Sequence, residues 1–359
     1  MRILFTTHQG ELAGATLSIT YLAQGLAKNG HEIHVACEQG CLLWKNLNKV
    51  DGVFPHDIRF QSYLDFKAAK ALSLIVREFQ IDLINAQGGK DRNLVILAKW
   101  ICRLSAKIVF TRRQRPRDEP WIKRWFHLNG TDGIVMVSHG LKKIFVKKGY
   151  PEYRLKVIHN GVDPGLIPQL GDKERKKIRV EYGLQGRVVG CLSRKKIQED
   201  IIRALKYLPE DITFLFVGIE RLDLQHVIDK ENPHQQLVFT GEVAHQEALQ
   251  YLQLMDVNIL ASHMEGFGLV LVEAMLSKVA VVASDFGGIP DIIDDQINGL
   301  LYENSQPQHL ADCVNKLLTN DEFRLKLIKN GHEKALRNFT IDRVIKDYEK
   351  YFTELVCQN

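Results

Sequence analysis

Short apolar runs alternate with longer amphipathic stretches along this chain, and the alternation occurs twice. In the first half, runs typical of buried strands lie at residues 2–6, 32–36, 83–85, 107–111, 133–137 and 156–158. In the second half, such runs lie at residues 188–192, 214–217, 237–240, 257–260 and 279–283. Helical patterns separate them, for example at residues 63–79, 94–104, 141–147, 310–318 and 323–336. Because successive parallel strands need a crossover, usually a helix, this alternation predicts parallel sheets with helices on both faces.

The length of 359 residues favours two domains, since single hydrophobic cores stop growing at about 250–300 residues. A turn-rich segment at residues 158–164 separates the two alternating halves, and it contains Asn160-Gly161 and then Pro164. This composition is typical of a hinge, although a local turn would have the same residues. We therefore predict one domain at residues 1–163 and a second at residues 164–339.

Charge is distributed unevenly between the two halves. Residues 1–165 contain 25 lysines and arginines against 14 aspartates and glutamates, whereas the remainder contains 23 against 29. A basic half is suited to a phosphorylated acceptor, an anionic membrane surface or nucleic acid. No recognition-helix or RNA-binding pattern accompanies the positive charge, so nucleic acid is not expected as a partner.

Residues 265–274, Glu-Gly-Phe-Gly-Leu-Val-Leu-Val-Glu-Ala, follow a buried strand run and open an apolar helix. The first N–H groups of a helix have no internal partner, so this turn is an anion-binding device. Gly266 and Gly268 would let a phosphate approach the backbone, and Glu265 and Glu273 bracket the turn. An ordinary strand-to-helix turn with two surface glutamates is the alternative. The combination suits a phosphorylated ligand that carries sugar hydroxyls.

The two spaced glutamates resemble the signature of retaining GT-B glycosyltransferases of the family 4 type, which act in lipopolysaccharide core and cell-surface polysaccharide biosynthesis. The segments at 160–163 and 284–301 resemble the same family. The resemblance implies an α/β GT-B fold, with two Rossmann-like doubly wound parallel-sheet domains facing a central cleft. It implies an acceptor-side domain at 1–163, a nucleotide-sugar donor domain at 164–339, and a C-terminal helix at 340–359 that crosses back to the first domain.

The implied reaction transfers a hexosyl unit from a nucleotide-diphosphate sugar to a hydroxyl of a glycolipid or polysaccharide precursor, with retention at the anomeric carbon. UDP is the nucleotide most frequent in donors of the family. By the resemblance, Glu265 would hold hydroxyls of the donor sugar near the reacting carbon, and Glu273 would accept from the ribose. The backbone of Phe267, Gly268 and Leu269 would bind the donor phosphates.

Three cations after the strand run at 188–192, namely Arg194, Lys195 and Lys196, are suited to a diphosphate leaving group. Lys196 matches the family lysine, but Cys191 stands where the family usually has an arginine, so Arg194 or Lys195 would supply the missing charge. A solvated basic helix start is the alternative. Gly14 resembles the glycine that approaches the donor phosphate after the first strand.

A basic segment with interleaved tryptophans surrounds the strand run at 107–111. Residues 90–125 contain 11 lysines and arginines against 3 acidic residues. The resemblance puts Arg113 near the reacting sugar, where many relatives have a histidine, and Arg113 and Glu265 are therefore the predicted catalytic residues. The predicted acceptor or membrane face consists of Arg112, Arg115, Arg117, Trp121, Lys123, Arg124 and Trp125. Cations with interfacial aromatics are typical of a membrane surface or a phosphorylated glycolipid, whereas a solvated face with core tryptophans is the alternative.

No Asp-x-Asp pair occurs in the sequence, so we expect no metal and no other cofactor. The six cysteines are scattered, and no apolar run approaches the length of a membrane span, about 18 residues. We therefore expect a cytoplasmic protein, peripheral on the inner face of the membrane. Two other functions share these features. One is a nucleotide-sugar epimerase of the same fold, which needs no acceptor, and the other is a non-catalytic sugar-nucleotide-binding partner.

Overall fold

The computed structural model describes residues 1–8, 14–114 and 120–357. The chain divides into two compact units. Unit 1 comprises Met1–Gly161 and Ile341–Asn359, and unit 2 comprises Val162–Thr340. Among the described residues, no helix combines the length and the apolar character needed to span a membrane.

Unit 1 is built on a seven-stranded parallel sheet in the order β3-β2-β1-β4-β5-β6-β7. The strands are β1 Arg2–Thr6, β2 Glu32–Cys37, β3 Val53–Asp57, β4 Leu83–Ala86, β5 Lys107–Arg112, β6 Gly133–Met136 and β7 Leu155–Val157. The helices are α1 Gly14–Lys28, α2 Leu42–Leu47, α3 Phe66–Glu78, α4 Gly89–Cys102, α5 Trp121–Asn129, α6 His139–Lys147 and α15 Ile341–Cys357. The strand order reverses between β1 and β4, which is where open α/β sheets bind ligands.

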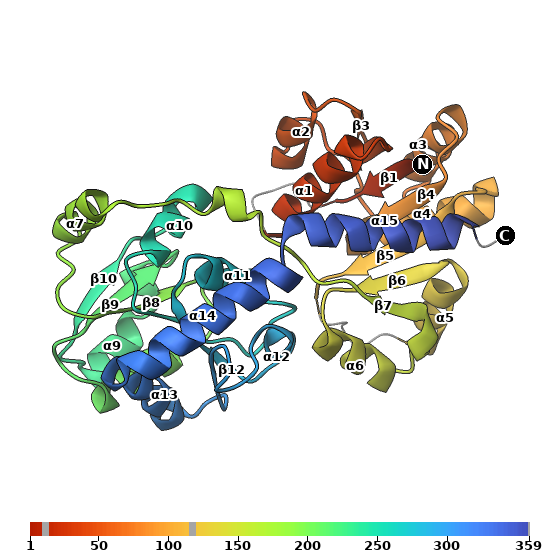
Figure 1. The fold of residues 1–359 in the computed structure, drawn as a ribbon. Helices are drawn as coiled ribbons and strands as arrows, with labels where there is room; N and C mark the ends of the chain where they lie inside the picture. Colours follow the sequence, from red (N-terminus) through yellow and green to blue (C-terminus); the bar gives the residue numbers. More distant parts are fainter. Residues whose placement is uncertain (9–13, 115–119, 358–359) are drawn as a thin grey trace. The chain divides into compact units, whose positions relative to one another are not determined.

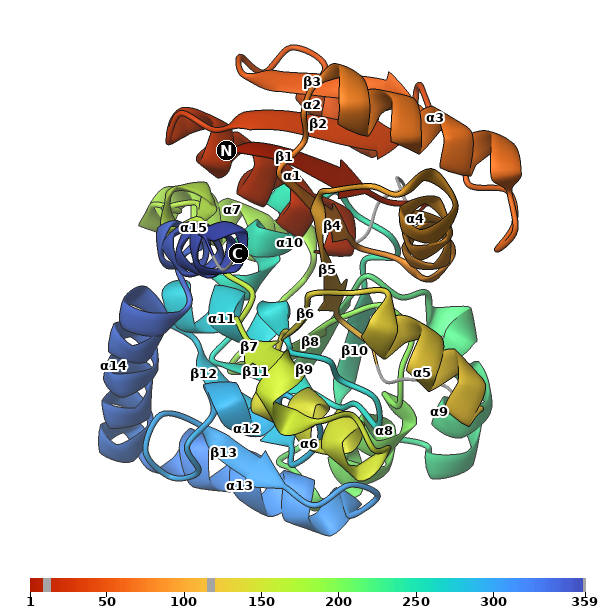
Figure 2. The ribbon, with the colours of Figure 1, turned by 90° about the vertical axis from the view of Figure 1, so that its right-hand side faces the viewer.

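The core of unit 1 forms because alternate strand residues face the apolar stripes of helices. Ile3, Phe5 and Val35 are buried against α1, α2 and α15. Helix α15 lies beside α1 (Figure 1), and its Tyr348 and Phe352 belong to the same core. Helices α3 and α4 lie side by side in unit 1 (Figure 2).

Unit 2 is built on a six-stranded parallel sheet in the order β10-β9-β8-β11-β12-β13. The strands are β8 Val188–Leu192, β9 Thr213–Val217, β10 Gln236–Phe239, β11 Val257–Leu260, β12 Ala280–Ser284 and β13 Leu300–Tyr302. The helices are α7 Asp172–Glu181, α8 Glu199–Ala204, α9 Gln225–Glu231, α10 His245–Leu252, α11 Leu269–Leu276, α12 Ile289–Ile292, α13 Pro307–Thr319 and α14 Asp321–Asn338. In Figure 1, α14 packs on α11. The strand order reverses between β8 and β11, which makes the carboxyl ends of these strands the expected ligand side.

The prediction of two Rossmann-like parallel-sheet domains is confirmed. Two short strands, β3 and β13, were not predicted, and each forms one edge of its sheet. Strand β3 has the sequence Val-Phe-Pro-His-Asp, in which only Val53 is buried. Proline is tolerated at a sheet edge, and an edge strand needs no continuous apolar run, so hydrophobicity gives little signal there.

A pair of histidines joins β2 to β3 and makes the stability of unit 1 depend on pH. His34 Nδ1 lies 2.8 Å from His56 Nε2, and the His34 Nε2 lies 2.9 Å from Glu32 Oε1. Burial lowers the pKa of His34, and burial together with the neighbouring His34 lowers the pKa of His56 to about 4. Because this folded-state pKa is below the unfolded value of about 6.5, the unfolded chain binds the proton first as pH falls.

We therefore expect the contribution of His56 to stability to be present above pH 6.5 and to be lost as pH falls toward 4. Between pH 6.5 and 5 the free energy of unfolding should decrease by about 1.5 kcal/mol through this group. Urea unfolding of the wild type and of His56→Gln at both pH values measures the difference. His234→Gln, which replaces an exposed histidine of unit 2, is the control. An equal pH dependence in wild type and His56→Gln would contradict the prediction.

Candidate functional site

The turn between β11 and α11 in unit 2 has the geometry of an anion site. Gly268 caps the helix with φ 106° and ψ 54°, a left-handed conformation that favours glycine. The peptide N–H groups of the first turn therefore begin directly after this residue. The N–H groups at the start of a helix and the positive end of its dipole favour a bound phosphate or carboxylate.

A second glycine turn, between β12 and α12, packs backbone to backbone against the first. A Cβ atom on Gly287 would lie 2.1 Å from the carbonyl oxygen of Glu265, and one on Gly288 would lie 2.3 Å from that of Gly266. The Gly288 N–H also donates to the Glu265 carbonyl over 3.1 Å. The position of the anion turn therefore depends on the glycines of its neighbour.

Glu265 is held by one of the predicted cations. The Lys196 ammonium forms an ion pair with Glu265 Oε2, although the two residues lie 69 positions apart in the sequence. Lys196 comes from the loop after β8, and Glu265 comes from the loop after β11, its neighbour in the sheet. Adjacent parallel strands thus bring a carboxylate and an ammonium together beside the anion turn.

Glu273 lies in the second turn of α11, and its side chain is 11% exposed. Its Oε1 lies 2.8 Å from Nε2 of His245, the first residue of α10. The hydrogen bond that Glu273 accepts, which outweighs the opposing effect of burial, raises the pKa of His245. The charged form of His245 is therefore favoured beside this carboxylate. His245 could not be selected from the sequence, because a single histidine has no spacing pattern.

The other two predicted cations are directed differently. Lys195 Nζ donates to Asp223 Oδ1 over 3.1 Å, and this contact is the main reason that the pKa of Asp223 is lowered. Arg194 is exposed, and within the described part of the chain no carboxylate pairs with it. Cys191 is buried, and burial raises the pKa of its thiol to about 11. A neutral thiol there adds no charge. Lys196, which pairs with Glu265, is the predicted cation that lies beside the turn.

In unit 1, Arg113 directly follows β5 and is partly buried at the carboxyl end of the sheet. One of its terminal nitrogens donates to Gln87 Oε1, whereas its buried Nε has no hydrogen-bond partner among the described residues. Burial lowers the pKa of the Arg113 guanidinium, although Tyr348 favours its charged form. Tyr348 is itself held 3.2 Å from Thr111 Oγ1. Gly14 is the first residue of α1.

The predicted acceptor or membrane face is centred on α5. Trp121 is 68% exposed, and the exposed Trp125 packs 5.9 Å from Trp100 of α4, measured between ring centroids. Lys123 and Arg124 are half-buried on the same helix. The tryptophans of α5 are therefore surface residues. Arg115 and Arg117 lie outside the described residues.

Two of the predicted arginines have partners inside unit 1. The Arg112 guanidinium lies 4.8 Å from the centroid of the Phe145 ring. Arg124 donates to the backbone carbonyl of Lys148. Arg112 thus connects the sheet to α6, and Arg124 connects α5 to the end of α6. Both contacts support the fold of unit 1.

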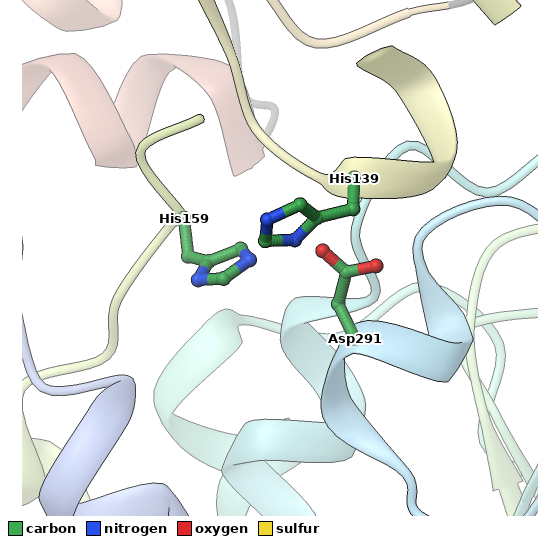
Figure 3. Close-up of side chains that lie close together, drawn as sticks. All are labelled: His139, His159 and Asp291. Carbon is green, nitrogen blue, oxygen red and sulfur yellow. The ribbon is translucent and has the colours of Figure 1, made fainter. Parts of the chain in front are cut away.

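Two histidines that the sequence did not single out meet after β6 and β7. His139 begins α6, and His159 follows β7; their ring centroids lie 5.5 Å apart, with 56° between the ring planes (Figure 3). The same figure labels Asp291, which belongs to α12 of unit 2. His139 and His159 could supply two ligands to a metal ion, and the described residues of unit 1 add no third.

A solved structure shares the fold of this chain, and family models place the chain in a family. The crystal structure of Anabaena HepE in complex with UDP and glucose superposes with a TM-score of 0.84 at 22% identity, covering 99% of this chain and 100% of HepE. Residues 12–166 match the model "Glycosyltransferase Family 4", and residues 176–334 match the model "Glycosyl transferases group 1". The chain belongs to the GT-B glycosyltransferases of the family 4 type.

Named relatives of this glycosyltransferase agree with the family models. An uncharacterized glycosyltransferase of Methanocaldococcus jannaschii, MJ1069, is 27% identical over 232 residues, which cover 63% of this chain and 59% of the relative. The alpha-monoglucosyldiacylglycerol synthase of Streptococcus pneumoniae is 25% identical over 381 residues, covering 94% of this chain and 83% of that enzyme.

Proposed function

We propose that this glycosyltransferase moves a hexosyl unit from a UDP-sugar to a hydroxyl of a glycolipid or polysaccharide precursor, with retention at the anomeric carbon. One observation carries the donor half of the proposal. In unit 2 a left-handed glycine opens a helix beside two carboxylates, of which Glu265 pairs with Lys196 and Glu273 is hydrogen-bonded to His245. HepE, which has the same fold, was crystallised with UDP and glucose, and this likeness supports UDP as the nucleotide.

Each group at the turn has a defined task in the proposed reaction. The N–H groups that follow Gly268 bind the diphosphate, and Lys196 neutralises the charge that develops on it. Glu265 accepts hydrogen bonds from hydroxyls of the donor sugar. Glu273 accepts from the ribose hydroxyls, and His245 holds that carboxylate in place.

The proposed transfer exchanges one bond at the anomeric carbon for another. The bond from this carbon to the diphosphate oxygen breaks, and the diphosphate leaves with the electron pair. The acceptor oxygen forms the new bond on the same face, and its proton passes to the departing phosphate oxygen. Hydrogen-bond donors that are already in position stabilise the charge that develops on the leaving group. The activation barrier is lowered because no water has to reorganise.

The exposed tryptophans of α5 support an acceptor that lies in a lipid surface. Indole rings favour the interface between headgroups and acyl chains, and nearby cations favour anionic lipids. The relative from Streptococcus pneumoniae is named for a glucosylated diacylglycerol, which agrees with a lipid acceptor. We propose that the enzyme is peripheral on the anionic inner face of the membrane.

Removing these rings should weaken membrane binding. We expect the double variant Trp121→Ser, Trp125→Ser to lose roughly 10-fold in affinity for vesicles that contain phosphatidylglycerol, because two exposed aromatic surfaces no longer enter the interface. Vesicle co-sedimentation measures the loss. Tyr153→Ser is the matched control, since Tyr153 is an 86% exposed aromatic of unit 1 outside this face. Equal binding of the double variant and the wild type would contradict the role.

A thermal-shift screen against UDP-, GDP- and ADP-sugars tests the donor, because a ligand at 100 times its Kd stabilises the folded chain by about 2.7 kcal/mol. We expect the largest rise in Tm with a UDP-sugar. Product analysis by NMR with and without an acceptor then tests the reaction. If epimerised donor forms without acceptor, the protein is an epimerase and not a transferase. If the donor binds but no acceptor of a panel is glycosylated, the protein is a sugar-nucleotide-binding protein and not an enzyme.

A further inference from the structure

Unit 1 contains a pocket of about 470 Å³ at the carboxyl edge of its sheet. Thr7, Glu38 and Ile58, which directly follow β1, β2 and β3, line it. Pockets beyond the carboxyl ends of parallel strands are the usual ligand sites of such sheets, and this volume is that of a small-molecule site. The donor turn described above belongs to unit 2, whereas the described residues that line this pocket all belong to unit 1.

One wall of the pocket is a histidine fixed by a buried carboxylate. His8 Nδ1 lies 2.7 Å from Oδ1 of Asp91, a side chain with no exposed surface. Asp91 Oδ2 accepts from the backbone N–H groups of Gln87 and Gly88 over 3.1 and 2.9 Å, and from the Thr6 hydroxyl over 3.3 Å. These bonds fix the position of the carboxylate. The histidine is 19% exposed and reaches the pocket.

The hydrogen bond to Asp91 decides what His8 can offer a ligand. An ionised carboxylate only accepts, so His8 Nδ1 carries the hydrogen, and in the neutral ring Nε2 is an acceptor. Among the described residues, none forms a hydrogen bond with Nε2. The ring can therefore accept a hydrogen bond from a ligand hydroxyl, or donate one to an anion when it is protonated.

The pocket also carries positive charge. Lys90, beside Asp91 in the first turn of α4, donates one hydrogen bond to the Gln61 carbonyl over 3.2 Å. Its ammonium has three N–H donors, and no carboxylate of the described chain is paired with it. Arg59, by contrast, is paired with Glu38 at 3.2 Å. Lys90 is thus the cation of this pocket that is available for an anionic ligand.

We propose that this pocket binds a hydroxylated phosphate, with Lys90 donating to the phosphate oxygens and His8 Nε2 accepting from a neighbouring hydroxyl. Its assignment as the subsite for the acceptor rests on the proposed transfer, whereas the phosphate site itself stands on the geometry of unit 1. The ligand class is a polyol or sugar phosphate, which occurs both as a soluble metabolite and as a lipid headgroup.

Gly88 offers a way to disturb the histidine without changing any charge. A Cβ atom on Gly88 would lie 2.3 Å from His8 Nδ1 and 2.4 Å from Asp91 Oδ1. Gly88→Ala should therefore separate His8 from Asp91 and leave Lys90 in place. It tests the positioning of the ring, whereas His8→Gln tests the ring itself.

The test is calorimetric titration of the full chain with glycerol 3-phosphate in the presence of saturating UDP, with neutral glycerol as a comparison. We expect Lys90→Gln to weaken glycerol 3-phosphate binding at least 10-fold, and His8→Gln and Gly88→Ala to weaken it about threefold. Lys67→Gln, which replaces an exposed lysine of α3, should bind like the wild type. Undiminished binding in Lys90→Gln would overturn the proposal, as would loss of binding in Lys196→Gln alone, because the phosphate would then lie in unit 2.

Two further experiments complete the test. The first distinguishes a lipid headgroup from a soluble phosphate, and the second distinguishes failure of this proposal from failure of the proposed function. Phosphatidylglycerol vesicles present a glycerol phosphodiester at a lipid surface, and sensitivity of vesicle binding to Lys90→Gln would identify a headgroup. If only soluble glycerol 3-phosphate is sensitive to Lys90→Gln, the ligand is a free phosphate. Titration with UDP alone distinguishes the failures: a wild type that binds glycerol 3-phosphate through Lys90 but no nucleotide would refute the proposed function and leave the subsite standing.

Discussion

Lys196→Gln should lower the turnover of sugar transfer by about 100-fold or more, because Lys196 is the predicted cation that lies beside the anion turn. Removing one group that stabilises a developing negative charge usually reduces turnover 100- to 1,000-fold. Its present partner, Glu265, would also lose its cation. Steady-state kinetics with saturating acceptor would show the decrease in kcat, and Lys196→Arg, which keeps the charge, should recover part of it.

Other lysines of unit 2 provide the comparison for this result. Lys195→Gln should reduce turnover much less, since its ammonium is directed to Asp223. Lys206→Gln, which removes an exposed cation next to Glu231, is the control for a change of charge alone. Equal losses in all three variants would show that the effect is a general one of charge. Melting temperatures of each variant would separate a loss of folding from a loss of chemistry.

Gly288→Ala should decrease the free energy of unfolding by about 2–3 kcal/mol and weaken donor binding at the same time. The new Cβ atom would lie 2.3 Å from the carbonyl oxygen of Gly266 and 2.8 Å from the Cα atom of Phe267. Both are backbone atoms, so relief requires the anion turn to move, and overpacking of this kind costs about 1–3 kcal/mol. Urea unfolding and a nucleotide titration of the same preparation measure the two effects.

Gly171→Ser is the matched control for this substitution. Gly171 is the N-cap residue of α7, and no atom lies within 4 Å of the site of its Cβ. Serine is favoured at that position of a helix, so stability should stay within about 0.5 kcal/mol of the wild type. If Gly288→Ala behaved like Gly171→Ser, the two glycine turns would not depend on one another as the geometry indicates.

The strands at the centre of both sheets could be predicted because they are buried on both faces and therefore read as continuous apolar runs. The edge strands could not, since β3 contains Pro55 and His56 and β13 has only three residues. The helix start at α4 was predicted five residues too late, at Leu94 instead of Gly89. Its first turn contains the polar residues Lys90, Asp91 and Arg92, which interrupt the apolar pattern.

At the candidate site, the sequence indicated the anion turn because strand, glycine and helix lie next to each other in the chain. The pairing of Lys196 with Glu265 could not be read in this way, as it follows from the order of β8 and β11 in the sheet. The partner of Glu273 was missed for the same reason, since His245 lies on another helix. Such contacts are set by tertiary structure, and a lone histidine leaves no periodic signal.

The place of α15 in unit 1 has a consequence for the order in which the protein can mature on the ribosome. Unit 2 is one uninterrupted stretch, so all residues of its core are available once residue 340 has left the exit tunnel. Unit 1 lacks Val344, Tyr348 and Phe352 until unit 2 has been synthesised, although its sheet is synthesised before unit 2. The part of the enzyme that is made first is therefore the part that is completed last, and its apolar face has to be kept from aggregation while unit 2 is being synthesised.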